Sequence, residues 1–352
     1  QQTYGSNCTF LGLNKAIVPR AIKSITQPLY LSRNYETMMY AVKQTDALTA
    51  LKKEGVNYAF YVPRDPGIEL DSSLLRIVDN RDLNYYHFEA FDRASEKMQR
   101  VRTRDLRKRI LNQVGVNPPD GQADIEFIRN LGGNYIVMDN RNNIVSGSAP
   151  TTFGMNGDSI VPQTPVLETD ESDNGKVYRI NTFFSFSSST YYSELSSHSK
   201  FINLMIKAGM YRPNYYDFPF FFVGEYYTIF VPSEEALNDY GVDNLSKDEL
   251  EQFLSYHFIR GDMIFTDGKK PDGAYSTSRL DESATVTRYS KMNIRTSPDL
   301  IEILDKNGDV YLEIPQDDEK ANNMVVTSSE SDDPQQQSRW NFRTTGVVHE
   351  ID

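Results

Sequence analysis

The clearest pattern of apolar and polar positions runs from residue 227 to residue 257. Residues 228–231 (TIFV) are β-branched or aromatic and predict a buried strand, which Pro232 ends because proline has no amide proton for the ladder. Ser233 and the two glutamates after it predict a helix start, since serine caps helices and the helix dipole favours carboxylates there. A second helix is predicted over residues 247–257, with a capping box at its start.

A similar pattern occurs earlier in the chain. Residues 58–64 (YAFYVPR) repeat the strand and proline, and amphipathic helices are predicted before each copy, over residues 35–54 and 191–208. Residues 177–181 and 346–351 predict a late strand in each half. A repeat of about 170 residues has the length of one domain, so we expect two copies of one domain.

These elements resemble the fasciclin-like FAS1 domain family, which has three signatures. The first has the form T-V-F-A-P-T-x-x-A-F, and residues 228–237 read TIFVPSEEAL. The second is a helix that ends in Tyr-His, and residues 250–258 read LEQFLSYHF. The closing strand reads N-G-V-I-H-V-I-D, and residues 345–352 read TGVVHEID. The residues that carry the resemblance are Thr228, Phe230, Pro232, Tyr256, His257 and His349.

The resemblance implies an α+β, β-rich fold of two FAS1-like β-sandwich wedges, each with helices packed on one side. We expect a divergent first domain over residues 34–185 and a second domain over residues 187–352, joined near the serine run at residues 186–190. Residues 1–33 would be an N-terminal arm or the tail of a preceding domain. The second possibility arises because residues 15–19 (KAIVP) are similar to the strand and proline that close a FAS1 domain.

The first copy departs from the family pattern. Residues 64–67 (RDPG) replace the helix cap and the acidic first turn, so the helix after this strand is not expected to be intact. A helix over residues 105–114 takes the place of the Tyr-His helix but has no histidine. It follows a basic run at residues 93–109, which contains Glu96 and Asp105 and no interleaved aromatics. This composition favours a solvated helix face over an anion-binding patch.

Residues 210–223 (MYRPNYYDFPFFFV) form an insert that the family pattern lacks, with seven aromatic residues. Two interpretations fit: a β-extension packed on the core, or an exposed patch that binds protein or glycan, since aromatic faces stack on sugars and supply contact area at low entropy cost. Burying apolar surface is worth ~25 cal/mol per Å², so we expect a partner, a domain or a ligand to cover part of the insert. The candidate binding residues are Tyr211, Tyr215, Tyr216, Phe218 and Phe220.

The net charge of −12 arises in the second half of the chain. Residues 187–352 carry 15 Lys/Arg and 28 Asp/Glu, against 22 and 21 in residues 1–186. Because a negative surface repels phosphate backbones, we expect no nucleic-acid partner. The single cysteine, Cys8, excludes an intrachain disulfide.

Patterns that would carry catalysis or bind a metal are missing or incomplete. There is no Ser-His-Asp order, G-x-S-x-G, P-loop or HExxH motif. Residues 305–316 open like a calcium loop, but Val310 and Gln316 stand where glycine and glutamate are required, so an Asn-Gly hairpin is favoured. His257 is expected to be structural, because helical periodicity places it inward with Phe253. We therefore expect no catalytic residue, cofactor or metal, with a hydrolase as the less favoured alternative.

The resemblance implies a non-enzymatic extracytoplasmic interaction or adhesion module. No apolar run approaches the roughly 18–20 residues of a membrane helix, and Gln1 is not an initiator methionine, so we interpret the chain as a mature or trimmed fragment. Long inserts and richness in Asn, Asp and Tyr look like cell-surface lipoproteins of gut Bacteroidota. That likeness implies a lipid anchor upstream and a protein partner in an outer-membrane assembly of a Gram-negative bacterium. The alternative is a glycan-binding accessory protein of a polysaccharide uptake system.

Overall fold

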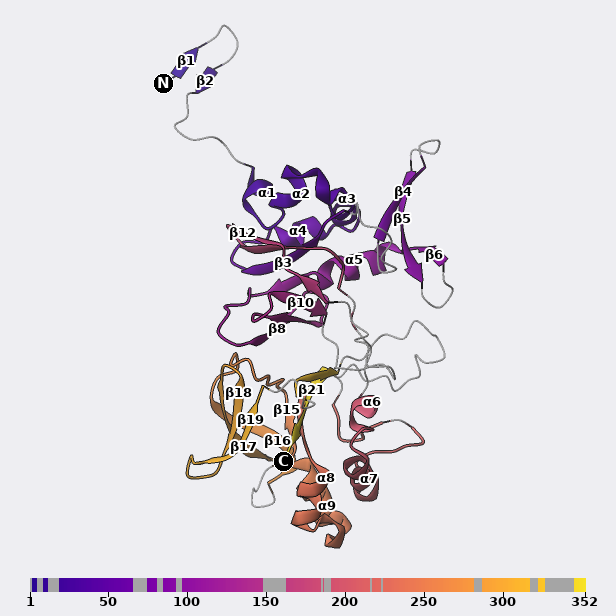
Figure 1. Cartoon of the computed structure of the whole chain (residues 1–352), viewed down its shortest axis with the longest axis vertical. Coiled ribbons are helices and arrows are strands. Elements are labelled where there is room, and N and C mark those ends of the chain that lie inside the picture. Colours follow the sequence, from indigo (N-terminus) through magenta and orange to yellow (C-terminus); the bar gives the residue numbers. More distant parts are fainter. Residues whose placement is uncertain are drawn as a thin grey trace. The chain divides into compact units, whose positions relative to one another are not determined.

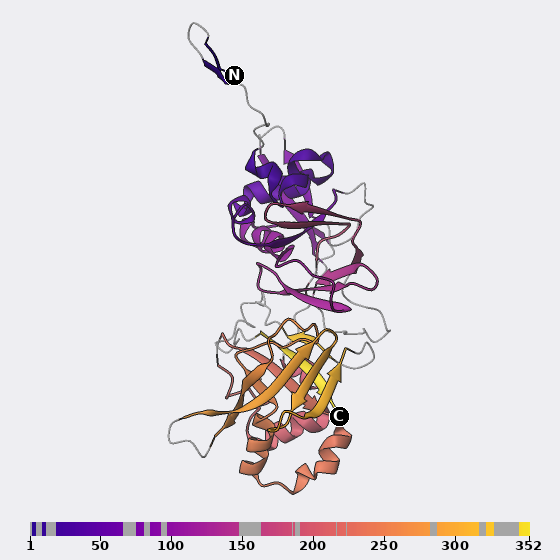
Figure 2. The same cartoon turned by 90° about the vertical axis from the view of Figure 1, so that its left-hand side faces the viewer.

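The computed structural model forms two compact units (Figures 1 and 2). The first joins residues 1–118 to residues 166–183, and the second joins residues 119–165 to residues 184–352. The sequence-based domain boundary stays a prediction. Positions 15–18, 66–67, 187–190 and 216, on which earlier expectations rest, lie outside the described residues. The structure describes residues 2–4, 9–11, 19–65, 75–80, 85–92, 97–147, 163–184, 186, 191–215, 217–222, 224–281, 287–316, 322–326 and 345–352.

The first unit contains a four-stranded sheet, in the order β12-β13-β3-β7, and several short helices. A three-stranded sheet, β4-β5-β6, and the hairpin β1-β2 are its other described strands. The strands are β1 (Gln2–Tyr4), β2 (Thr9–Leu11), β3 (Tyr58–Pro63), β4 (Leu75–Asn80), β5 (Tyr85–Asp92), β6 (Lys97–Arg100), β7 (Val114–Val116), β12 (Glu168–Ser172) and β13 (Gly175–Ile180). The helices are α1 (Arg20–Lys23), α2 (Gln27–Leu31), η1 (Arg33–Tyr35), α3 (Glu36–Gln44), α4 (Ala47–Leu51) and α5 (Thr103–Asn112).

Two helices stand where a single one was predicted over residues 35–54. Helix α3 ends at Gln44, and Asp46 takes a left-handed conformation, with φ of 54°, before α4 begins. A residue in that conformation cannot continue a right-handed helix, so the amphipathic pattern is divided while its apolar residues stay buried. Helix α5 begins two residues before its predicted start and buries Leu106 and Ile110, as the periodicity predicts.

The second unit is built on an eight-stranded sheet, in the order β19-β18-β17-β16-β15-β14-β21-β20. A four-stranded sheet, β11-β10-β9-β8, also belongs to this unit. Its strands are β8 (Ile125–Arg129), β9 (Tyr135–Asp139), β10 (Ile144–Gly147), β11 (Thr164–Pro165), β14 (Tyr226–Pro232), β15 (Phe258–Arg260), β16 (Gly273–Leu280), β17 (Tyr289–Ser297), β18 (Leu300–Leu304), β19 (Val310–Pro315), β20 (Met324–Val326) and β21 (Thr345–Ile351). Its helices are α6 (Tyr191–Leu195), α7 (Ser199–Ala208), α8 (Glu234–Tyr240), η3 (Val242–Asn244) and α9 (Lys247–Ser255).

Both helices predicted after β14 form with the caps that the sequence indicates. The Ser233 hydroxyl accepts a hydrogen bond from the Ala236 amide at 3.2 Å, and Gly241 ends α8 in the left-handed conformation. Ser246 and Glu249 form a full capping box at the start of α9. These local signals fix where α8 and α9 begin, and therefore which side chains they present toward the sheet.

The eight-stranded sheet folds over on itself (Figure 2). Phe230 of β14 and Ile314 of β19 share one buried apolar cluster, although four strands lie between them in the sheet order. In a flat sheet, five strand spacings would hold them about 24 Å apart. The opposite face of β14, which carries Ile229 and Val231, packs against the helices. A folded sheet with helices on one side confirms the predicted α+β, strand-rich fold.

The two units use the same parallel pairing at their centres. In the first, β3 pairs with β13 from Tyr58 opposite Gly175 to Pro63 opposite Ile180. In the second, the equivalent positions of β14 pair with β21 from Tyr227 opposite Gly346 to Pro232 opposite Ile351. The sequence repeat therefore extends to the pairing register, because in both copies a tyrosine opposite a glycine begins this stretch and a proline opposite an isoleucine ends it.

Candidate functional site

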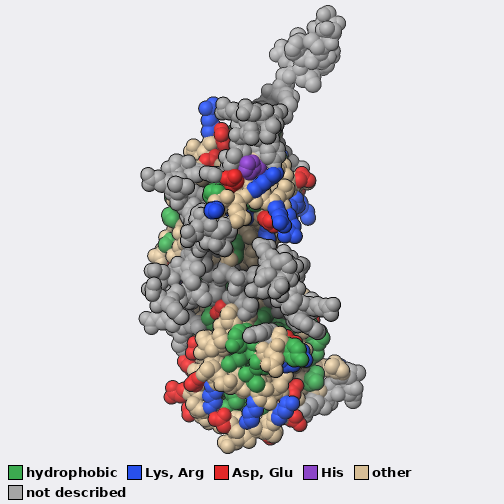
Figure 3. Space-filling view, turned by 90° about the vertical axis from the view of Figure 1, so that its right-hand side faces the viewer, with side chains coloured by type: hydrophobic (Ala, Val, Ile, Leu, Met, Phe, Trp, Pro, Cys, Tyr) green, Lys and Arg blue, Asp and Glu red, His purple; other side chains and the backbone are tan. Residues whose placement is uncertain are grey.

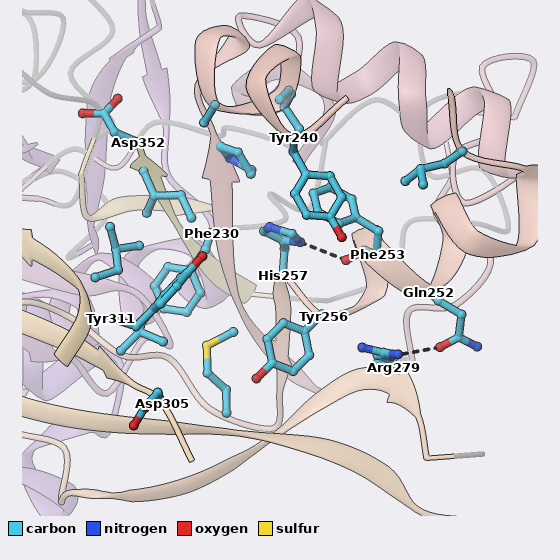
Figure 4. A pocket seen from close by; sticks show the side chains of 18 of the residues that line it. Phe230, Tyr240, Gln252, Phe253, Tyr256, His257, Arg279, Asp305, Tyr311 and Asp352 are labelled. Atoms are coloured by element: carbon cyan, nitrogen blue, oxygen red, sulfur yellow. Dashed lines mark hydrogen bonds between the residues drawn. The ribbon is translucent and has the colours of Figure 1, made fainter. Parts of the chain in front are cut away.

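A groove in the second unit is the main candidate site (Figure 4). It has a volume of about 860 Å³ and lies between helices α8 and α9 on one side and strands β18 and β19 on the other, with β14 and β17 contributing to its floor. We call it the α9 groove. It includes Tyr256 and His257 of the Tyr-His signature, which the sequence singled out, whereas Tyr240 and Arg279 belong to none of the three signatures.

Aromatic side chains form both walls of the α9 groove. On the helical side, Tyr240 stacks on Phe253 with ring centroids 4.8 Å apart, and Phe253 lies 4.8 Å from the His257 ring. On the opposite side, Tyr311 of the edge strand β19 lines the groove. Tyr240 and Tyr311 are 64% and 80% exposed, so both rings are available to a ligand.

His257 is half-buried and faces the groove next to Phe253. One ring nitrogen, Nδ1, lies 3.0 Å from the Phe253 carbonyl oxygen and donates to it. Burial lowers the pKa of His257 to about 4, although these backbone contacts oppose the shift. The imidazole is therefore neutral near pH 7 and adds no positive charge to the groove.

Carboxylates outnumber cations along the groove. Among the described lining residues, Arg279 is the positively charged one, and its guanidinium Nε donates to the Gln252 side-chain oxygen at 3.2 Å. The Ser246 cap lowers the pKa of Glu249, and backbone amides, that of Asp309 first, lower the pKa of Asp305. Both groups stay ionised well into the acid range. The acidic lining residues within the described ranges are Asp248, Glu249, Asp305 and Asp352.

The turn at Asp305 has a structural explanation. Its carboxylate accepts hydrogen bonds from the amides of Asn307 and Asp309 at 2.8 and 2.9 Å, which closes the hairpin between β18 and β19. Both amides donate to Oδ1, and the other carboxylate oxygen, Oδ2, accepts from the Asn307 side-chain amide at 3.2 Å. Among the described residues, no group of three or more His, Cys, Asp or Glu side chains is placed to hold a metal.

The other signature residues lie in the core. The His349 side chain is fully buried, its Nε2 donates to the Ile264 carbonyl at 2.9 Å, and burial lowers its pKa to about 4. The Thr228 hydroxyl donates to the Asp262 carbonyl and accepts from the Ile264 amide, both at 2.9 Å. Thr228 and His349 thus hold the segment after β15 from two sides. Phe230 is also fully buried, and Pro232 is buried at the end of β14.

The aromatic insert is largely part of the helical core. Tyr211 and Phe218 are 2% and 6% exposed, and Phe220 is half-buried. The insert folds back because Arg212 and Asp217 are joined by a backbone hydrogen bond of 3.0 Å and by a close ion pair. Of the candidate residues, Tyr215 reaches the solvent, at 63% exposed. Whether these residues bind a partner stays a prediction, but the surface they offer is smaller than the sequence suggested.

A buried polar cluster, which the sequence did not indicate, joins the β8–β11 sheet to the rest of the second unit. The Asp267 carboxylate accepts a hydrogen bond from the Phe127 amide at 3.1 Å, and Lys269 lies 3.2 Å from the buried Glu126 carboxylate. Phe127 also stacks on Phe265 with ring centroids 4.4 Å apart. Burial raises the pKa of Asp267 to about 6. The cluster lies within one compact unit and serves as an attachment between its two sheets.

Comparisons with known proteins agree with the resemblance in the second half. Residues 197–330, under half of the chain, match the family model described as Fasciclin domain. Such domains are typically extracellular or surface-associated, non-enzymatic adhesion and interaction modules. No curated protein matches the chain. Among the described residues, no helix has the length and apolar character needed to cross a membrane. Among solved structures, a FAS1 domain pair from the insect cell adhesion molecule fasciclin I is similar over 91% of this chain and 94% of its own, at 10% identity and a TM-score of 0.28.

Proposed function

We propose that this chain is a non-enzymatic extracytoplasmic interaction module. It acts as an accessory subunit of a cell-surface or outer-membrane assembly of a Gram-negative bacterium, with a lipid anchor upstream. The likeness to Bacteroidota surface lipoproteins rests on its long inserts and its content of Asn, Asp and Tyr. The fasciclin match over residues 197–330 supports the interaction role.

The observation that carries this proposal is the set of aromatic rings that the second unit leaves in water. Tyr215, Tyr240 and Tyr311 are each more than 60% exposed. Figure 3 shows hydrophobic side chains gathered on the face of this unit that carries α6 and α7. Aromatic residues are enriched at the centres of protein interfaces, because a ring gives much contact area for few frozen torsions. A partner that covers these rings would remove apolar surface from water.

Site-specific crosslinking in the producing cell tests this function. A photoreactive phenylalanine analogue replaces Tyr215 or Tyr311 in the full chain, and Glu171, an exposed residue of the first unit, serves as the control position. We expect one defined membrane or surface protein to be captured at a tyrosine position and not at the control. Equal capture of many proteins at all three positions, or none at any, would contradict the proposal.

A glycan is the second candidate ligand, and the α9 groove favours it. Exposed Tyr240 and Tyr311 lie in one groove with the polar side chains of Gln252, Arg279 and Asp305, the combination of stacking faces and hydrogen-bonding groups that sugars require. Calorimetric titration with neutral oligosaccharides tests this candidate. Saturable binding that Tyr311→Ala abolishes would support it, and no binding by any of them would exclude neutral glycans.

A further inference from the structure

We propose that the α9 groove binds a cationic, arginine- or lysine-bearing peptide segment of the partner. This inference rests on the interaction role proposed above and goes further by naming the chemistry of the ligand. It rests on three features of one cavity, namely its size, its aromatic walls and the sign of its charge.

The size of the groove fits a short segment of chain. Its volume of about 860 Å³ lies in the upper part of the roughly 300–1,000 Å³ range typical of ligand pockets. A single metal ion or small cation would leave most of that space filled by water. Tyr240 and Tyr311 are exposed and come from opposite sides of the groove, α8 and β19, so a ligand can enter between them.

The walls offer the faces of aromatic rings. A guanidinium or ammonium group over a tyrosine face is attracted by the ring's negative potential, and the same chain already uses this contact elsewhere. The Arg260 guanidinium lies 3.9 Å from the centre of the Phe222 ring and 4.9 Å from the Tyr289 ring. In the α9 groove, by contrast, Tyr240 and Tyr311 have exposed rings, and Arg279 is held by Gln252 on the helical side in Figure 4.

The charge of the groove selects the sign of the ligand. Asp248 and Glu249 lie on the helical wall at the start of α9, and Asp305 and Asp352 lie on the other side in Figure 4. In the described part of the chain, Arg279 is the cation that lines the groove together with these four carboxylates. A neutral glycan gains nothing from this field and an acidic one is repelled, whereas an arginine- or lysine-bearing segment is attracted to both walls.

Fluorescence anisotropy with a labelled triarginine peptide tests the proposal in the full chain. We expect saturable binding that weakens with added salt, and no binding of a labelled tricitrulline peptide, which has the same shape without the charge. Tyr311→Ala should weaken binding about threefold, because it removes a cation–π face. Tyr215→Ala removes an exposed ring outside the groove and should have no effect.

Charge variants separate this groove from general attraction to an acidic protein. Asp248→Asn and Glu251→Gln remove one charge each from helix α9, but only Asp248 lines the groove. We expect Asp248→Asn to weaken binding about threefold and Glu251→Gln to leave it unchanged. Arg279→Gln should tighten binding of triarginine, because it removes a positive charge from the groove.

Several outcomes would overturn the inference. Equal effects of Asp248→Asn and Glu251→Gln would show diffuse attraction, and tighter binding of neutral oligosaccharides than of triarginine would assign the groove to glycans. The proposed function is tested separately by the crosslinking experiment. Capture of a partner without triarginine binding would leave the interaction role standing and remove only the cationic ligand. Triarginine binding without capture would remove the interaction role and, with it, the assignment of the cationic segment to a partner, while the preference of the groove for cations would stand.

Discussion

Gly346 in β21 is a position where the second unit should tolerate one added methyl group poorly. A Cβ built there would lie 2.6 Å from the Tyr227 carbonyl oxygen and 2.2 Å from the Tyr191 hydroxyl. The hydroxyl belongs to a side chain and can move. The carbonyl is part of β14 and stands opposite Gly346 in the parallel ladder, so it can move only if the central pairing of the unit shifts.

The size of the effect follows from this geometry. Overpacking a well-ordered core costs about 1–3 kcal/mol, and a clash with backbone belongs at the upper end of that range. Gly→Ala also restricts the unfolded chain, which by itself raises the free energy of unfolding by about 0.4–1 kcal/mol. Gly346→Ala should therefore lower the free energy of unfolding of the second unit by about 2 kcal/mol. For a unit of this size, that corresponds to a melting temperature lower by about 4–8 °C.

Differential scanning calorimetry of the full chain measures this effect, with Gly273→Ala as the matched control. Gly273 begins β16, and a Cβ there would meet no atom within 4 Å, so we expect a change below about 0.5 kcal/mol. The double variant Tyr191→Phe/Gly346→Ala removes the hydroxyl contact but keeps the carbonyl contact, so it should recover only part of the loss. If the melting temperatures of Gly346→Ala and Gly273→Ala differ by less than about 1 °C, the steric reasoning is wrong.

Three further predictions concern other parts of the chain. Gly175→Ala should destabilise the first unit by more than about 2 kcal/mol, because Gly175 has φ of +143° and a Cβ there would lie 2.0 Å from the Tyr58 carbonyl oxygen. In calorimetry, the unfolding transition of the first unit should move to a lower temperature or vanish. Phe218→Ala removes a buried ring and should lower the free energy of unfolding by about 3–4 kcal/mol, whereas Tyr215→Ala should lower it by less than about 0.5 kcal/mol. Urea unfolding measures both changes, and equal midpoints for the two variants would contradict this prediction. Burial raises the pKa of Asp267 to about 6, so protonation favours the folded state, and this stability is full below about pH 4 and lost as the pH rises through 6. The free energy of unfolding of the wild type relative to Asp267→Asn should accordingly fall by at most about 3 kcal/mol from pH 4 to pH 7, and a difference that does not change with pH would refute this assignment.

Local signals in the sequence predicted the elements around the site but not the site itself. The strand at residues 226–232 and the caps at Ser233 and Ser246 follow from residue types within a few positions of each other. The α9 groove brings Tyr240 and Tyr311 onto facing walls from positions far apart in the chain, and no local periodicity encodes that meeting. Its floor also depends on how far the eight-stranded sheet folds over.

The aromatic insert shows why burial is harder to predict than secondary structure. Seven aromatics in fourteen residues left two interpretations open, an extension packed on the core and an exposed patch that binds a partner or glycan. The pairing of Arg212 with Asp217 closes the segment on itself and turns Tyr211 and Phe218 inward. A charge pair five residues apart in an irregular segment has no distinctive pattern, so its effect on burial was not visible in the sequence.

The two copies place opposite charges at the same point of the topology. Helix α5 leads into β7 as α9 leads into β15, and both strands pair antiparallel with the strand that ends in proline. Yet α5 exposes a basic face, whereas α9 exposes Asp248, Glu249 and Glu251. Both copies share the pairing register, so the fold sets it. The charge differs between α5 and α9, so the fold does not set it. A ligand that the α9 groove attracts would therefore be repelled at the equivalent helix of the first unit, and recognition depends on how each copy has diverged rather than on the fold they share.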